Sequence, residues 1–121
     1  ALSGLPEGVM VYEVNGPFFF GAAHKFTSML AGFTTTPKVM ILRMRNVGSL
    51  DATGLRVLES LLNNQLSGGP KLVLSGVQPQ PMRVLTKSGF VERIGKENVN
   101  PNLNAAIART NEILKASESV E

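Results

Sequence analysis

A change of hydrophobic period in the middle of the chain constrains the fold most. Residues 39–45, VMILRMR, are rich in large apolar residues that alternate with a period of two, which predicts a buried β-strand. After the loop NVGSL, the apolar spacing becomes three and four, which predicts a helix with one apolar face. The residues of that face are Leu55, Leu58, Leu62 and Leu66. The residues that end the helix are Gly68, Gly69 and Pro70.

The junction between this strand and this helix is where we look first for chemistry. Asp51 is a good N-cap, because its carboxylate can accept from the free N–H groups of the first helical turn. Thr53 then lies in that turn, where the helix dipole stabilises a phosphate or another anion. Gly54 has no side chain, so the backbone of a partner could approach closely. The alternative is structural, since Thr and Gly are common at helix starts without any function.

Length and composition limit the classes of function. A chain of 121 residues suits one domain with one core. The net charge of +3 is small and spread along the chain, and only 6% of the residues are aromatic, so we do not expect nucleic-acid binding. The chain has no cysteine, which excludes disulfides and thiolate chemistry. Its single histidine, His24, excludes a multi-histidine metal site.

Two features bear on the larger protein. No run of about 18 apolar residues is present, so we expect no membrane-spanning segment and no signal peptide in these residues. The chain also begins with Ala1 and not with Met, which leads us to expect a fragment of a longer protein or a trimmed chain.

The amino-terminal third predicts a hairpin followed by a helix. Residues 8–15 alternate as a strand, and the Asn-Gly-Pro turn after them leads to a short second strand at 18–21 that we expect to pair with the first. Residues 22–33 carry one apolar stripe and predict a helix. His24 falls outside that stripe, so it is expected to be a solvated residue and not a ligand.

The carboxyl-terminal half predicts further alternation. Residues 71–77 form a strand joined to the central strand by a parallel crossover. A short helix is expected at 81–88, with Pro81 at its first position and Met82 and Leu85 facing inward. Its outward cations are Arg83 and Lys87, for which a solvated face is the favoured interpretation.

The end of the chain predicts a short edge strand near residues 98–100 and a final helix capped by Asn102. The inner stripe of this helix consists of Leu103, Ala106, Ile107, Thr110 and Leu114. The whole pattern predicts an α/β fold with a mixed sheet of four to five strands, mostly parallel after the amino-terminal hairpin, packed by about four helices.

No enzyme motif assembles from these residues. The sequence has neither a Gly-x-x-x-x-Gly-Lys loop nor a Gly-x-Gly-x-x-Gly fingerprint. A Ser/His/Asp triad would need His24, which lies off the predicted core stripe. We therefore expect no catalytic residues, no bound metal and no cofactor.

Several segments resemble a known family. Residues 46–54, where Asp-Ala-Thr-Gly opens a leucine-rich helix after an apolar strand, resemble the signature of STAS domains. These are the anti-sigma factor antagonists and the cytoplasmic C-terminal domains of sulfate permease (SulP) family anion transporters. Residues 6–12 and 15–22 are similar to the transporter branch, which has a Gly-Pro-Leu-Phe-Phe-like strand before its first helix. The segments that resemble the closing part of that branch are 88–90, 94–95, 97–99 and Pro101.

The resemblance implies a STAS fold for residues 1–121 and a regulatory, non-catalytic role on the cytoplasmic face of the membrane. The implied partners are the transmembrane part of the same transporter and a soluble cytoplasmic protein or kinase, and a homodimer stays open. In antagonist proteins the residue that matches Thr53 is phosphorylated by a partner kinase, so Thr53 is a candidate phosphate acceptor. Ala52 replaces the serine that often precedes it.

Two other interpretations remain at this point. One is a free anti-sigma factor antagonist that captures a kinase through the face around Thr53. The other is a nucleotide-binding module, for which the sequence offers only the helix start and the nearby Ser-Gly turn at 75–76. The residues predicted to form the partner or anion-binding loop are Ser49, Asp51, Ala52, Thr53, Gly54, Arg56, Ser75 and Gly76.

Overall fold

The fold was obtained as a computed structural model that describes residues 8–15, 38–66 and 68–119. The second strand of the predicted hairpin, the predicted helix at 22–33 and His24 lie outside the described residues. The described elements are β1 (Val9–Asn15), β2 (Val39–Asn46), α2 (Ala52–Leu66), β3 (Lys71–Ser75), α3 (Pro79–Lys87), α4 (Phe90–Ile94), the 3-10 helix η2 (Lys96–Asn98), β4 (Val99–Asn100) and α5 (Leu103–Ser119).

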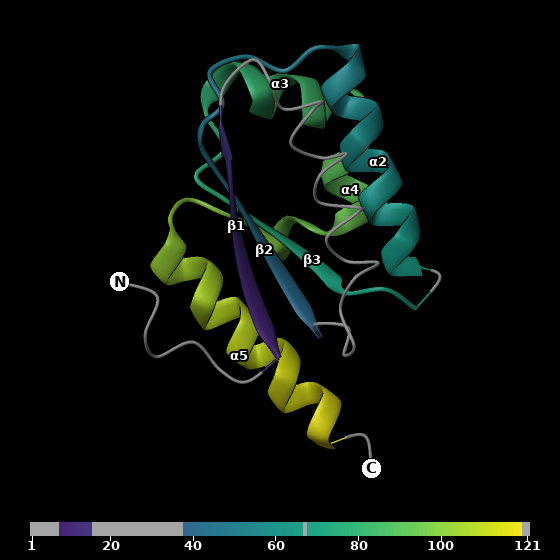
Figure 1. Ribbon diagram of the computed structural model, residues 1–121, viewed down its shortest axis with the longest axis vertical. Coiled ribbons are helices and arrows are strands. Elements are labelled where there is room, and N and C mark those ends of the chain that lie inside the picture. Colours follow the sequence, from purple (N-terminus) through teal and green to yellow (C-terminus); the bar gives the residue numbers. More distant parts are fainter. Residues whose placement is uncertain (1–7, 16–37, 67, 120–121) are drawn as a thin grey trace.

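The described strands form one sheet in the order β1-β2-β3-β4, and each neighbouring pair is parallel. Val11 lies beside Ile41, which in turn lies beside Val73, so the three longer strands are in register. The α/β class, the parallel pairing of the strands before and after α2, and the short strand near residues 98–100 are therefore confirmed. All carboxyl ends of these strands meet at one edge of the sheet, where α2 begins (Figure 1).

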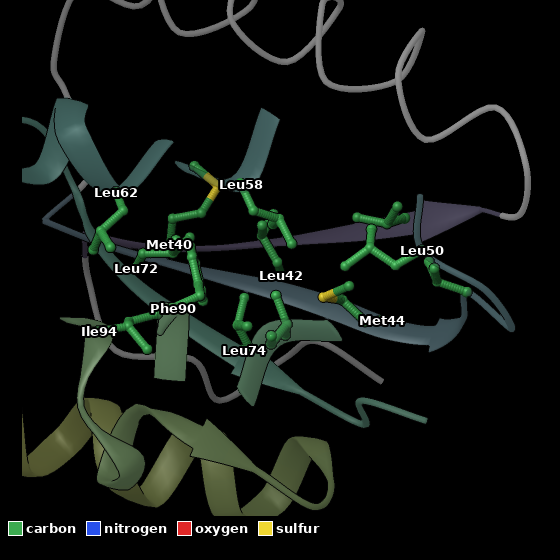
Figure 2. Close-up of a cluster of buried hydrophobic side chains, with 13 residues drawn as sticks. Met40, Leu42, Met44, Leu50, Leu58, Leu62, Leu72, Leu74, Phe90 and Ile94 are labelled. Atoms are coloured by element: carbon green, nitrogen blue, oxygen red, sulfur yellow. The ribbon is translucent and has the colours of Figure 1, made fainter. Parts of the chain in front are cut away.

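Strand alternation divides the core into two layers. On β2, Met40, Leu42 and Met44 face a large buried cluster that also contains Leu58 and Leu62 of α2. Figure 2 shows these side chains packed between the sheet and the helices. The intervening strand residues face the second cluster, which the buried Ala106 of α5 completes. Helices thus cover both faces, which explains why β2 is apolar on both sides.

Local sequence signals set both ends of α2. The Asp51 Oδ1 atom accepts from the N–H of Gly54 at 2.9 Å, so the predicted N-cap is confirmed. At the other end, Gly68 adopts a φ of +96°, which ends the helix in a left-handed turn. The prediction that Leu66 belongs to the inner face is wrong, because its side chain is 72% exposed. The last turn of α2 runs past the buried layer that Leu58 and Leu62 enter.

The next helix begins earlier than predicted. α3 starts at Pro79 with Gln78 as its N-cap residue, so Pro79 takes the first position that we expected for Pro81. Pro81 is buried within the first turn, and Leu85 is fully buried as predicted. Arg83 and Lys87 are exposed, in agreement with a solvated face.

The final helix crosses the second face of the sheet. Asn102 Oδ1 accepts from the N–H of Ala105 at 2.8 Å, which confirms the predicted cap of α5. Ala106 and Thr110 are fully buried, and the other predicted inner residues pack around the same cluster. Arg109 of this helix donates to the buried Asn98 at 2.8 Å, which fixes α5 beside η2.

Candidate functional site

The loop between β2 and α2 is held down at both ends and exposed in its middle. Val47 and Leu50 are buried, and they anchor the loop to the core. Gly48 and Ser49 lie between them and are exposed. The loop therefore presents a short polar segment to solvent on a fixed base.

Gln80 of α3 fixes this loop by hydrogen bonds to the backbone of Leu50. The Oε1 atom of Gln80 accepts from the N–H of Leu50 at 2.7 Å, and its Nε2 atom donates to the Leu50 carbonyl oxygen at 3.3 Å. The two bonds satisfy both backbone groups of a buried residue that lies outside the helices and strands. Gln80 was not found by sequence reasoning, because a single glutamine in a helix carries no signal of what it contacts.

The start of α2 displays its hydroxyl residue to solvent. Asp51, Ala52 and Thr53 are all exposed, and the Asp51 carbonyl oxygen accepts the first helical bond from Leu55 at 2.9 Å. The N–H groups of Ala52 and Thr53 face the helix end with no hydrogen bond to any described group. A phosphoryl group on Thr53 would therefore lie beside free donors and the positive end of the helix dipole.

Arg56 adds a positive charge to this turn. It is exposed and follows Thr53 by three residues, so the two side chains share one face of α2. Within the described part of the chain the Arg56 guanidinium makes no ion pair. The turn thus combines a hydroxyl, a cation and the carboxylate of Asp51.

The structure gives Gly54 a different role from the one we expected. Gly54 is buried on the same side of α2 as Leu58 and Leu62, at spacings of four residues. Its backbone is therefore covered and not open to solvent. The expectation that Gly54 admits the backbone of a partner is therefore wrong.

Ser75 and Gly76 are not part of this exposed surface. Ser75 is fully buried at the end of β3, and its hydroxyl has no hydrogen-bond partner among the described residues. Gly76 has a φ of +66°, and a Cβ atom there would lie 3.3 Å from Cβ of Arg45. The N–H of Gly76 donates to the backbone oxygen of Asn100 at 2.9 Å, so this turn is tied to the neighbouring strand β4.

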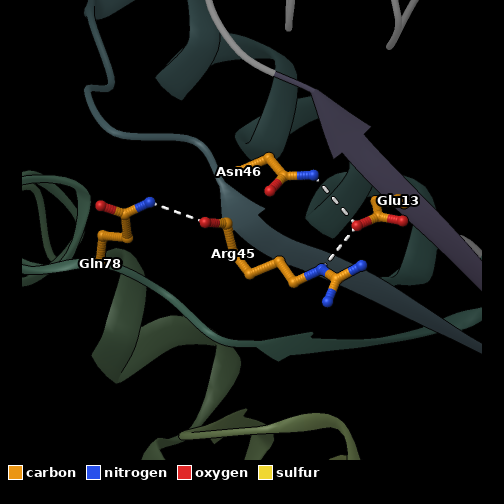
Figure 3. Close-up of polar contacts among 4 residues, drawn as sticks. All are labelled: Glu13, Arg45, Asn46 and Gln78. Atoms are coloured by element: carbon orange, nitrogen blue, oxygen red, sulfur yellow. Dashed lines mark hydrogen bonds and ion pairs between the residues drawn. The ribbon is translucent and has the colours of Figure 1, made fainter.

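A polar cluster at the same edge of the sheet was missed by sequence reasoning (Figure 3). Glu13 of β1 accepts from Arg45 Nε at 2.7 Å and from Asn46 Nδ2 at 3.1 Å. Gln78 donates to the backbone oxygen of Arg45 at 2.7 Å. The bond from Arg45 holds the pKa of Glu13 below its ordinary value, and the charge of Arg43 adds to this effect. The cluster ties β1 and the start of α3 to the end of β2, directly before the exposed loop.

Other site chemistry is limited in the described residues. These residues contain no group of three His, Cys, Asp or Glu side chains that could hold a metal ion. None of their helices is both long enough and apolar enough to cross a bilayer. What the site offers is an exposed polar surface that consists of the loop and the first turn of α2.

Sequence comparisons identify a matching family model and a similar protein. A family model described as the STAS domain matches residues 5–106. The chain is 34% identical over 91 residues to the Bacillus subtilis protein YvdB, which is named as a candidate sulfate transporter. That alignment covers 74% of this chain and 17% of YvdB, so the chain spans about a sixth of the length of this relative.

Solved structures agree with the sequence comparison. The STAS domain of a SulP transporter from Vibrio cholerae has a TM-score of 0.84 and 33% identity, and the match covers 94% of this chain and 89% of that one. A sulfate transporter family protein from Wolinella succinogenes has a TM-score of 0.83 and 40% identity, covering 92% and 91%. A candidate anti-sigma factor antagonist from Thermotoga maritima shares the fold, with a TM-score of 0.66 and 19% identity over 86% and 88%.

Proposed function

This chain belongs to the STAS domains of the SulP transporter family, and from that premise we propose that it is the non-catalytic regulatory domain of an anion transporter. It forms one domain of a longer membrane protein and lies at the cytoplasmic face of the membrane. The transported ion is sulfate or a related anion, selected by the membrane part. The short span of this chain on its relative YvdB supports such a division of labour.

The observation that carries this proposal is the fixed and exposed turn at the start of α2. Gln80 and two buried side chains hold the base of the loop, while Thr53 and Arg56 face solvent. A rigid surface loses little conformational entropy when it binds, so it suits repeated docking and release. We propose that Ser49, Asp51, Ala52, Thr53 and Arg56 contact the transmembrane part or a soluble cytoplasmic partner.

Phosphorylation of Thr53 would act as a switch on this surface. A phosphate adds a charge of about −1.5 to −2 at neutral pH. The free N–H groups of the helix start and the nearby Arg56 would stabilise that charge, while the Asp51 carboxylate would repel it. Because Thr53 is exposed, the modification would change the affinity for a partner without requiring the domain to refold.

The proposal is tested in the full-length transporter. Deletion of this domain, and separately Thr53→Asp, are introduced, and anion uptake into vesicles is measured. We expect both changes to alter the uptake rate, and Thr53→Ala to retain the unmodified behaviour. Ser60→Asp places the same charge on another exposed position of α2 and serves as the control. Uptake that is unchanged by the deletion would contradict a regulatory role, and uptake that responds equally to Ser60→Asp would contradict a role of this turn.

A further inference from the structure

Three polar residues lie side by side near the carboxyl edge of the sheet, one on each of three neighbouring strands. Arg43 of β2 pairs in register with Ser75 of β3, which pairs in register with Asn100 of β4. Ile41 and Val73, two residues earlier on their strands, face the core cluster beneath α5. Because side chains alternate along a strand, the three polar residues face the same side as this cluster. They are called the polar row below.

The polar row contains donors that have no partner. Ser75 is fully buried, and its hydroxyl makes no hydrogen bond to any described group. The side-chain nitrogen of Asn100 is also buried and unpartnered. Arg43 is half-buried, and within the described part of the chain its guanidinium makes neither a hydrogen bond nor an ion pair. A buried donor without a partner is costly, so two of them on neighbouring strands call for an explanation.

The neighbouring carboxylate does not satisfy these donors. Glu13 lies beside Arg43 in register, but its side chain accepts from Arg45 and Asn46 instead. The groups that are left are a guanidinium and an amide nitrogen, which only donate, and a hydroxyl, which can donate. A ligand that completes them must supply acceptors, and the positive charge of Arg43 favours a ligand with negative charge.

We propose that the polar row binds a small oxyanion of the sulfate or phosphate type. Ser75 lies between the other two residues, which are two strand spacings, or roughly 10 Å, apart. Arg43 and Asn100 are partly exposed, so the anion enters between them. Its entry breaks no hydrogen bond of Arg43, whose long side chain can close over the bound anion.

A larger ligand with a chain of phosphates suits this position less well. The N–H of Gly76, the loop donor next to Ser75, is already bonded to the backbone oxygen of Asn100. The regulatory consequence of oxyanion binding rests on the proposed function. A domain that binds the transported ion would report its cytoplasmic level to the membrane part.

NMR titration of the 121-residue chain tests the binding itself. The probes are sodium sulfate, sodium phosphate and, at matched ionic strength, sodium chloride. We expect saturable amide shifts at Ser75, Gly76 and Asn100 with an oxyanion and no saturable shift with chloride. Tighter binding of sulfate supports the link to transport, and tighter binding of phosphate overturns that link.

A pair of charge variants tests the role of Arg43. Arg43→Gln removes a charged donor, so we expect the dissociation constant for sulfate to rise at least about tenfold. Arg83→Gln removes the same charge from an exposed position of α3 and is expected to leave the constant unchanged. An equal rise in both variants would show that net charge and not the polar row attracts the anion.

Replacement of Ser75 separates ligand binding from a structural role. Ser75→Ala removes a buried donor that lacks a partner, so in buffer without oxyanion we expect a thermal unfolding midpoint no lower than that of the parent. We also expect sulfate to raise this midpoint less than it raises that of the parent. A lower midpoint with unchanged sulfate affinity would show that a buried water satisfies the hydroxyl, which overturns the proposal.

The absence of saturable shifts with both oxyanions also overturns it. None of these experiments measures transport. The proposed regulatory function would therefore still stand or fall by uptake in the full-length protein.

Discussion

The side-chain amide of Gln80 pairs with both backbone groups of Leu50, accepting from its N–H at 2.7 Å and donating to its carbonyl oxygen at 3.3 Å. This arrangement connects the first turn of α3 to the loop that precedes α2. The shape of the exposed turn therefore depends on a residue that lies 30 positions away in the sequence.

Replacement of Gln80 tests this connection. Gln80→Ala leaves the Leu50 N–H and carbonyl oxygen without their partner, so we expect a loss of about 1–3 kcal/mol in the free energy of unfolding. Urea unfolding measures the loss, and amide hydrogen exchange should become faster at Leu50. Arg83→Ala on the exposed face of the same helix should change stability by less than about 0.5 kcal/mol. Equal midpoints for the two variants would contradict the role of Gln80.

The N-cap of α2 gives a second prediction. Asp51→Ala removes the acceptor for the Gly54 N–H and should cost about 1 kcal/mol in the free energy of unfolding. Asp51→Asn retains a side-chain oxygen and should recover most of that loss. Urea unfolding of the three proteins compares them directly. If Asn were as destabilising as Ala, the cap would not act through its hydrogen bond.

The two ends of one hydrophobic stripe should respond differently to truncation. Leu58→Ala removes a fully buried side chain and should lower the free energy of unfolding by about 2–5 kcal/mol. Leu66→Ala removes a side chain that is mostly in water, so a change below about 0.5 kcal/mol is expected. Thermal or urea unfolding distinguishes the two results. Comparable losses would place Leu66 in the core.

The cluster around Glu13 predicts a dependence of stability on pH. The hydrogen bond from Arg45 lowers the pKa of Glu13 in the folded protein relative to its ordinary value of 4.5. The folded state therefore favours the charged form, and this stabilisation is fully present above the ordinary pKa and is lost as the pH falls through the lowered one. Glu13→Gln should be less stable than the parent above that range, and the difference should shrink on acidification.

Urea midpoints measured across that pH range test this expectation, and an NMR titration of the Glu13 carboxyl gives the pKa directly. Glu92→Gln, an exposed carboxylate without an ion pair among the described residues, controls for the loss of one negative charge. A difference between Glu13→Gln and the parent that stayed constant with pH would show that the ion pair with Arg45 does not contribute to stability.

Elements that depend on local signals were predictable from the sequence. The N-caps Asp51 and Asn102 each accept from the backbone three residues later, and such short-range bonds follow from residue type and position. The dense apolar run of β2 likewise predicted a buried strand, and the structure shows that both of its faces are covered. The place of Thr53 in the first turn of α2 followed from the cap at Asp51, and Thr53 is exposed there, although its modification stays a prediction.

Features that depend on tertiary contacts could not be predicted from local sequence signals. The short helix α4 exists because Phe90 and Ile94 are buried, and five residues carry no reliable periodicity. Leu66 matches the spacing of the inner stripe, but periodicity does not reveal where the covered layer ends. The contacts of Glu13 with Arg45 require knowledge of which strands are neighbours and in which register they pair.

The order β1-β2-β3-β4 follows the order of the chain, so each described strand after β1 pairs with a strand that has already been synthesised. The last described element is α5, and it is the one described helix that contributes to the cluster around Ile41 and Val73. Until synthesis reaches α5, that face of the nascent sheet lacks this cover. If synthesis stalled before this point, the nascent chain would therefore expose the apolar face of its sheet, to which chaperones could bind.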